Sequence, residues 1–276
     1  MWKWVQPELP TNFWEKLRNK GAYATDRLIL RELLAGSENL NNDDCLTMIR
    51  LYDDRDTKPF VSNPWMEDVR PSRGRFDTID YIEEMIVTDG IKGDVIETGV
   101  WRGGLGIYMS FVFRGRLVFL ADSFEGCQDP KKATYFYDKE IHYKGQHMAT
   151  LADVKTNVEK FWGKAPEHIK YIVGYFQDTL INRPIRAEDG TILNEISLLR
   201  FDADTYSATL EVLNNLYPIV SPGGFVIIDD YCVETCRTAL LEWLKDHPEI
   251  ELCHPLTYKK LCKNEYPCGA WWRKEK

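Results

Sequence analysis

The feature that most constrains the fold is an alternation of short apolar segments with helical ones, which begins at Asp94. The apolar segments predict strands at residues 94–99, 117–122, 169–173, 196–201 and 224–230. Because such strands are buried on both faces, the alternation predicts an α/β fold with a mainly parallel sheet between two layers of helices. Ligands of such sheets bind beyond the carboxyl ends of the strands. Functional residues are therefore expected at the last positions of each strand.

The segments between and around these strands complete the expected architecture. Helical spacing is found at residues 100–113, 151–162, 207–216 and 232–246. After them, Glu249–Leu256 and Gly269–Arg273 have the pattern of two strands without a helix between them, which predicts an antiparallel hairpin at the sheet edge. Further helical runs at 12–20, 28–34, 45–52 and 76–87 predict a helical N-terminal extension.

The composition excludes several classes of protein. Of 276 residues, 44% are hydrophobic and 13% aromatic, which is enough for a large core. The 35 basic against 43 acidic residues give a net charge of −8, which argues against nucleic acid as a partner. No run approaches the roughly 18 apolar residues of a membrane span. The first residues lack the pattern of a signal peptide, so a cytoplasmic protein with reduced cysteines is expected.

A glycine-rich turn follows the first strand. Its glycines are Gly99, Gly103 and Gly104, and they allow a tight turn into a helix and a close approach of a ligand to the backbone. The second strand ends in Asp122-Ser123, 23 residues after Gly99. A carboxylate at this place can accept hydrogen bonds from ribose hydroxyls. Tight strand–helix packing and a helix cap are the alternatives, but together the two features indicate a bound nucleoside.

Polar residues also follow the later strands. Asp178, after the third strand, either bonds an adenine edge or starts a helix as its N-cap. Two pairs of acids follow the fourth and fifth strands: Asp202, Asp204, Asp229 and Asp230. Four carboxylates that converge without a compensating Lys or Arg would repel one another, so a bound divalent cation is expected. Oxygen ligands favour Mg²⁺ over zinc, with Mn²⁺ or Ca²⁺ as alternatives. Helix capping and turn formation are the structural alternative for these acids.

Two common catalytic motifs are absent from the sequence. It contains neither the GxSxG elbow of a hydrolase nor the GxxxxGK[ST] loop of a nucleotidase. No histidine has catalytic or metal-ligand spacing, although His142 and His147 lie in a polar, aromatic insertion at 124–149 that could contact substrate. The sequence thus directs attention to the acids and the glycine turn.

The motifs resemble those of a known family. They are DVIETGVWRGG at 94–104, ADSFEG at 121–126, DTL at 178–180, LRFDADTYSAT at 199–209 and SPGGFVIIDDY at 221–231. This set is similar to the macrocin O-methyltransferases, metal-dependent enzymes that use S-adenosylmethionine to methylate sugar hydroxyls of macrolide and aminocoumarin natural products. The resemblance implies a Rossmann-like, seven-stranded class I methyltransferase sheet at 66–276, mostly parallel with a C-terminal antiparallel hairpin. Residues 1–65 would form the helical extension or lid.

The resemblance also implies roles for individual residues. Those expected to bind the cofactor are Glu97, Thr98, Gly99, Gly103 and Gly104, with Asp122 and Ser123 at the ribose and Phe176 and Asp178 at the adenine. Asp229 and Asp230 match the metal ligands of the family, and either Asp202 or Asp204 would be the third. Strand geometry allows both of the latter to face the site, so one would ligate and the other act as base or support. Asp204 is the preferred base.

The expected reaction is transfer of a methyl group to a hydroxyl of a small-molecule acceptor. Coordination to Mg²⁺ would lower the pKa of that hydroxyl and fix its position. Two other functions remain open, a catalytically silent cofactor-binding scaffold and a nicotinamide-dependent oxidoreductase. The scaffold needs no acidic quartet, and the oxidoreductase explains neither the quartet nor the C-terminal hairpin. The sequence leaves the acceptor and a homo-oligomeric state open.

Overall fold

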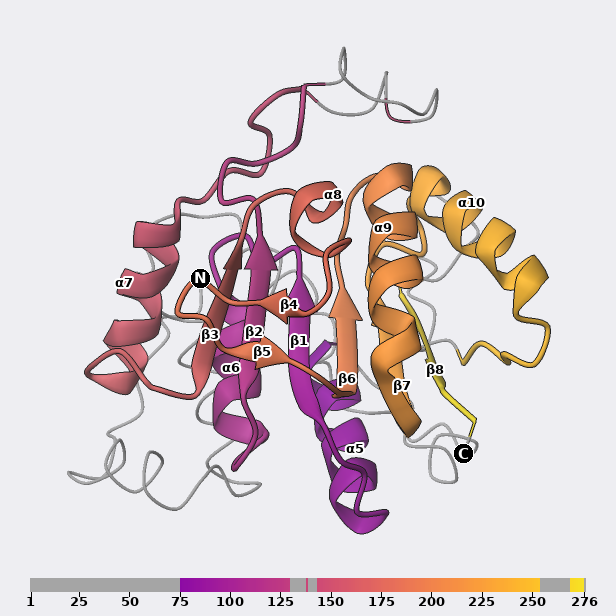
Figure 1. Cartoon of the computed structure of the whole chain (residues 1–276), viewed down its shortest axis with the longest axis horizontal. Coiled ribbons are helices and arrows are strands. Elements are labelled where there is room, and N and C mark those ends of the chain that lie inside the picture. The colour runs from indigo at the N-terminus through magenta and orange to yellow at the C-terminus, as the bar shows by residue number, and fades with distance from the viewer. Residues whose placement is uncertain (1–74, 130–137, 139–142, 254–268, 276) are drawn as a thin grey trace, which may run out of the picture.

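The computed structural model describes residues 75–129, 138, 143–253 and 269–275. Their centre is a six-stranded sheet of order β3-β2-β1-β6-β7-β8 (Figure 1). The strands are β1 Asp94–Thr98, β2 Val118–Asp122, β3 Ile169–Val173, β6 Ile196–Phe201, β7 Val220–Ile228 and β8 Ala270–Arg273. All neighbouring pairs are parallel except β7 and β8, which are antiparallel. The chain runs outward from β1 to β3 and then returns to β6 on the other side of β1, so the topological switch point lies between β1 and β6.

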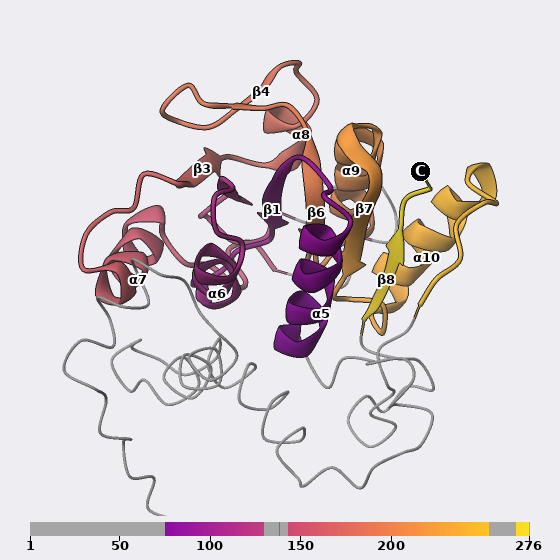
Figure 2. The same ribbon diagram turned by 90° about the horizontal axis from the view of Figure 1, so that it is seen from below.

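Helices cover both faces of this sheet (Figure 2). One face packs against α5 Arg75–Thr88, α6 Gly104–Val112 and α7 Leu151–Trp162. The other packs against α9 Tyr206–Leu216 and α10 Glu234–Trp243, which continue into the short 3₁₀ helices η3 Tyr217–Ile219 and η4 Leu244–Asp246. A one-turn helix α8 Phe176–Thr179 and a small hairpin of β4 Ile185–Arg186 and β5 Ile192–Leu193 lie between β3 and β6 along the chain.

The central elements form because their residues suit double-sided burial. Every residue of β6 is buried, and so is every residue of α6, whose sequence GLGIYMSFV carries no charge. Gly106 allows this helix to lie close to the sheet, since a Cβ there would come within 2.4 Å of Leu120. The partly exposed helix α7 is amphipathic instead, and Thr150 with Asp153 forms a capping box at its start. Strand β6 and helix α6 are thus packed on all sides.

The predicted elements are mostly confirmed. The helix at 151–162 and the strands at 169–173 and 196–201 have the predicted bounds, and the helix at 76–87 appears as α5. Helix α6 begins at Gly104 instead of residue 100, because Gly103 adopts a left-handed conformation with φ 87°. The β4–β5 hairpin was not predicted. The three earlier helical runs, and the proposed division at residue 65, lie outside the described residues.

The C-terminal hairpin is only partly as predicted. Its second strand forms β8 and pairs with β7, whereas in place of the first strand the described residues show a single bridge between Cys253 and Trp271. After η4 the chain turns at Pro248 and Glu249, at the position where the first strand of the hairpin was expected to begin. Residues 254–256 of the predicted strand lie outside the described part. The described residues therefore form a six-stranded sheet, whereas seven strands were expected.

No helix of the described residues combines the length and apolar character that a membrane span requires.

Candidate active site

The residues that follow β1, β6 and β7 lie side by side at the end of the sheet where these strands have their carboxyl ends. Their backbone hydrogen bonds continue the strand ladder by one position: Gly99 donates to Ala121 at 2.9 Å, Asp202 to Thr98 at 2.8 Å and Asp229 to Phe201 at 3.0 Å. The switch point between β1 and β6 lies at this end of the sheet. The structure therefore brings the predicted glycine turn and the predicted acids together, although up to 131 residues separate them in sequence.

The glycine turn approaches the acid-bearing loop very closely. Gly99 has φ 80°, and a Cβ at this position would lie 1.7 Å from the carbonyl oxygen of Asp202. Gly103 is the N-cap of α6 and provides no side-chain cap, so the first N–H groups of that helix, from Gly104 onward, remain for a ligand. The turn has the geometry of an anion- or cofactor-binding loop. Thr98 is fully buried beneath it.

Asp122 shapes this turn. Its carboxylate accepts hydrogen bonds from the backbone N–H groups of Val100 at 2.7 Å, Trp101 at 3.1 Å and Phe124 at 2.8 Å. Much of its acceptor capacity thus serves the protein itself. Its predicted bond to ribose stays a prediction. Ser123 lies beside it and donates to the carbonyl of Gly126 at 3.0 Å.

The residues predicted for the adenine end are dispersed. Phe176 is half-buried and packs against the core beside α9, and Asp178 is exposed on α8. Tyr175, not Asp178, is the N-cap of α8, so the capping alternative for Asp178 is wrong. Burial, followed by the negative charge of Glu125, raises the pKa of the Tyr175 hydroxyl, and the side chain of Ser123 opposes this rise.

Asp178 affects a different residue, Glu211 of α9. Burial, followed by the negative charges of Asp138 and Asp178, raises the pKa of Glu211 to about 7. The folded protein therefore holds this proton more tightly than the unfolded chain, whose glutamates titrate near 4.3. The stabilising contribution is complete below that value and is lost as the pH rises through about 7.

Replacement of Glu211 by Gln is expected to remove this pH dependence. At pH 4 the variant should match the wild type in its free energy of unfolding. At pH 8 it should be more stable by about 2 kcal/mol, less than the roughly 3.7 kcal/mol of the full shift because the partly exposed carboxylate is screened by solvent. Urea denaturation at both pH values measures the difference. The exposed Glu159→Gln, which also removes one carboxylate, is the control and should show no such gain. An equal effect of Glu211→Gln at both pH values would refute the assignment.

A buried arginine lies beneath the acids. The Arg200 guanidinium contacts Glu97 at 2.6 Å, Asp202 at 2.9 Å and Asp229 at 2.7 Å. Arg200 is 3% exposed and Glu97 1%, and the three carboxylates raise the pKa of the guanidinium against the opposing effect of burial. The expectation that the acids converge without a compensating cation is therefore wrong for Asp202 and Asp229. Glu97 is part of the support beneath the glycine turn.

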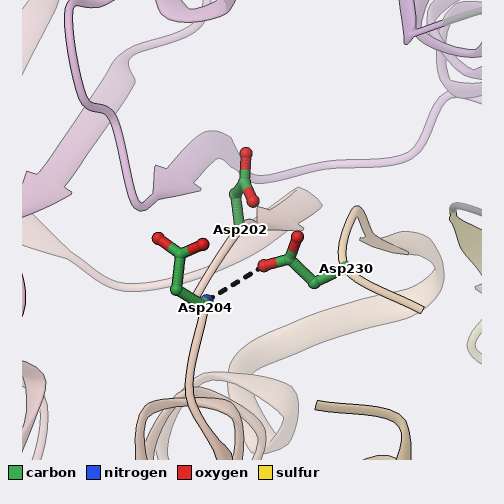
Figure 3. Close-up of side chains that lie close together, drawn as sticks. All are labelled: Asp202, Asp204 and Asp230. Carbon is green, nitrogen blue, oxygen red and sulfur yellow. Dashed lines mark hydrogen bonds between the residues drawn. The ribbon is translucent and has the colours of Figure 1, made fainter. Parts of the chain in front are cut away.

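Three of the four predicted acids nevertheless meet. Asp202, Asp204 and Asp230 each offer a carboxylate oxygen, and these oxygens lie within 4.8 Å of one another (Figure 3). The backbone N–H of Asp204 donates to the Asp230 carboxylate at 2.9 Å. Burial and the charges of Asp204 and Asp229 raise the pKa of Asp230 to about 7. The negative charge at this corner thus exceeds what Arg200 neutralises, and an all-oxygen donor set with excess charge fits a hard divalent cation.

The capping alternative for these acids is not borne out. Thr205 is the N-cap of α9, and its hydroxyl accepts a hydrogen bond from Ala208 at 3.2 Å. Neither Asp202 nor Asp204 is needed for that purpose. Asp229 lies apart from the cluster of three, buried against Arg200.

Backbone strain concentrates at the same end of the sheet. In the described residues, four non-glycine residues have positive φ: Trp101 at 45°, Phe124 at 56°, His147 at 58° and Asp204 at 57°. The first two follow β1 and β2, and the last follows β6. His147 packs edge-on against Trp101 with ring centroids 5.9 Å apart. Strained conformations of this kind cluster at functional sites. His142, the other histidine of the insertion, lies outside the described residues.

Sequence reasoning missed three residues here. Arg200 had a visible signal, because an arginine in an otherwise apolar strand and two positions before Asp202 shares that residue's face. Cys127 and Asp138 had none. Cys127 lies near the acids, since burial and then Asp204 and Asp122 raise its pKa to about 12.

Comparison with known proteins relates this site to a family. The profile of the macrocin-O-methyltransferase (TylF) family matches residues 25–273. The chain is 37% identical over 177 residues to the 8-demethyl-8-(2,3-dimethoxy-alpha-L-rhamnosyl)-tetracenomycin-C 4'-O-methyltransferase of Streptomyces olivaceus, covering 61% of this chain and 64% of that one. It is 36% identical over 183 residues to the mycinamicin III 3''-O-methyltransferase of Micromonospora griseorubida, covering 63% and 68%. The match thus spans about two thirds of each relative.

Solved structures agree with the profile. The O-methyltransferase NovP superposes with a TM-score of 0.69 at 25% identity, covering 92% of this chain and 99% of that one. The calicheamicin methyltransferase CalS11, at 17% identity and a TM-score of 0.52, shares the fold. The predicted fold class, a mostly parallel methyltransferase sheet with an antiparallel C-terminal strand, is confirmed. The chain belongs to the macrocin O-methyltransferase family.

Proposed function

We propose that this protein transfers a methyl group from S-adenosylmethionine to a hydroxyl of a small-molecule natural product, with a divalent cation at its acidic cluster. The observation that carries the proposal is the contact between the two halves of the site. Gly99 packs so closely on Asp202 that no side chain fits between them. A cofactor in the glycine turn and a cation at the acids would therefore be neighbours.

The glycine turn supplies the cofactor site. The free N–H groups at the start of α6 suit a carboxylate, and the left-handed glycines allow the ligand to approach the backbone. Thr98, Gly99, Gly103 and Gly104 would line it, with Asp122 and Ser123 toward the ribose. For the adenine end we propose Tyr175, whose pKa is influenced by Ser123, in place of the predicted Phe176 and Asp178.

The acidic cluster supplies the cation site. Asp202 and Asp230 would hold Mg²⁺, with Mn²⁺ or Ca²⁺ as alternatives, and Asp204 would lie beside the cation as the third carboxylate of the cluster. Asp229, which contacts Arg200 through Oδ2, would add a ligand through Oδ1. When bound, the cation would lower the pKa of the acceptor hydroxyl and fix its position.

The aspartates then divide the remaining work. Arg200 holds Asp202 in place by its contact at 2.9 Å. The Asp204 side chain is presented by a strained turn next to Asp230, and this position leaves it the role of the base that removes the hydroxyl proton. The acceptor oxygen must line up with the sulfonium methyl group, so rigid placement of these side chains matters as much as their charge.

The acceptor is proposed to be a sugar hydroxyl of a glycosylated natural product. The relatives from Streptomyces olivaceus and Micromonospora griseorubida are named for methylation of such compounds. Trp101 of the glycine turn and His147 of the insertion pack against each other, and they would offer aromatic surface to a sugar ring.

Titration with S-adenosylhomocysteine tests the cofactor assignment. Calorimetry should show binding in the micromolar range, about −8 kcal/mol, and no binding of NAD under the same conditions. Binding of NAD with equal affinity would favour the oxidoreductase alternative, and no binding of S-adenosylhomocysteine would refute the proposal. A silent scaffold would also bind S-adenosylhomocysteine, but it would not need the acidic cluster. The aspartate variants described below therefore distinguish the enzyme from the scaffold.

A further inference from the structure

Asp138 connects the insertion to the acidic corner from 68 residues upstream. Its carboxylate accepts hydrogen bonds from the backbone N–H groups of Tyr206 at 2.8 Å and Ser207 at 3.1 Å. Asp138 is only 6% exposed. Its two oxygens therefore satisfy two of the N–H groups that the first turn of α9 would otherwise leave without a partner.

Helix α9 is thus capped twice. Thr205 provides the local N-cap through the N–H of Ala208, and Asp138 provides a second, charged cap at the two preceding N–H groups, those of Tyr206 and Ser207. A negative charge at a helix N-terminus also interacts favourably with the helix dipole. The Tyr206 hydroxyl adds a third tie, to Glu242 of α10.

The restraints act on the turn that carries Asp204. This turn is strained: Asp204 has φ 57°, and the N–H of Thr205 bonds the carbonyl of Ala203 at 2.6 Å. On one side it is held by the bond from the Asp204 N–H to Asp230. On the other side it continues directly into the first turn of α9, where Asp138 binds. A conformation of this cost persists only where its surroundings enforce it.

We propose that Asp138 is a positioning residue for Asp204: by fixing the first turn of α9 it enforces the strained turn that presents the Asp204 carboxylate to the acceptor. Asp138 itself contacts neither the acidic cluster nor the glycine turn through any described hydrogen bond or ion pair. The kinetic part of this inference rests on the proposed function, whereas the structural part does not.

Amide hydrogen exchange tests the structural part. In Asp138→Ala, the N–H groups of Tyr206 and Ser207 should exchange at least tenfold faster than in the wild type. The N–H of Asp204, which Asp138 does not touch, should also exchange faster, because the turn relaxes. Asp138→Asn keeps one acceptor oxygen and should give intermediate rates, and it serves if the Ala variant fails to fold.

Methyl transfer tests the kinetic part. The kcat of Asp138→Ala should fall by about 10- to 100-fold, while the KM for S-adenosylmethionine stays within twofold. The matched control is Asp94→Ala. It also removes a carboxylate that accepts a hydrogen bond from a backbone N–H, that of Leu117 at 3.0 Å, but at the opposite end of the sheet. That control should lose stability but keep its kcat and its exchange at Asp204.

The outcomes separate the two proposals. Unchanged exchange at Asp204 in Asp138→Ala, or an unchanged kcat, would overturn the positioning role, and so would an equal loss of kcat in Asp94→Ala. If the wild type transfers no methyl group, the proposed function fails, and the exchange experiment still decides whether Asp138 holds the turn.

Discussion

Replacement of Asp230 by Asn is expected to lower the rate of methyl transfer by about 10² to 10³-fold. The variant removes the charge of one of the three clustered carboxylates but keeps an oxygen that can accept the Asp204 N–H. The fold should not suffer. Burial and the charges of Asp204 and Asp229 already raise the pKa of Asp230 to about 7, and the neutral amide relieves that repulsion.

Initial rates of transfer from labelled S-adenosylmethionine measure this effect, together with the melting temperature of each protein. The exposed Asp189, which pairs with Lys170 near the β4–β5 hairpin, provides the control variant Asp189→Asn. It should retain wild-type activity. A rate for Asp230→Asn within twofold of the wild type would show that the acidic cluster does not take part in the reaction.

Replacement of Arg200 by Met is expected to cause the largest loss of stability. The side chain is 3% exposed and compensates three carboxylates, of which Glu97 and Asp229 are themselves buried. Removal of one partner leaves the other charges buried without compensation, which costs about 3–5 kcal/mol. Urea denaturation should show a loss of this size, and S-adenosylhomocysteine binding should weaken, because Glu97 supports the glycine turn.

Two companion variants identify the cause of that loss. Arg200→Lys keeps the charge but cannot span three carboxylates, so it should lose less stability than Arg200→Met. The double variant Arg200→Met with Glu97→Gln should recover part of the loss, because one buried charge is gone. A cost below about 1 kcal/mol for Arg200→Met would contradict the view that this ion-pair network supports the site.

The strands and helices could largely be predicted because their signals are local. Strand β6 is a buried run of six residues that is apolar except for Ser197 and Arg200, and helix α7 has an amphipathic pattern, so both were predicted with their observed bounds. The start of α6 could not be predicted, since it depends on the left-handed Gly103 and the turn that Asp122 holds from 21 and 22 residues away. In place of the first strand of the C-terminal hairpin, the structure has a turn at Pro248 and Glu249 and a bridge at Cys253, and residues 254–256 of that strand lie outside the described part.

The site was harder to predict because its decisive contacts are between distant residues. The acids were found from their place at the strand ends, and the structure brings Asp202, Asp204 and Asp230 together. Their division into a cluster of three and an ion-paired Asp229 depends on Arg200, which meets Glu97 across 103 residues only because β1 pairs with β6. The support that Asp138 gives to α9 has no local signal at all.

The cation site is the central claim, and titration with Mn²⁺ followed by electron paramagnetic resonance tests it without knowledge of the acceptor. The wild type should bind one Mn²⁺, which excess Mg²⁺ displaces, and Asp230→Asn should bind it at least tenfold more weakly. Absence of Mn²⁺ binding to the wild type, or equal binding to the Asp230→Asn variant, would contradict the claim.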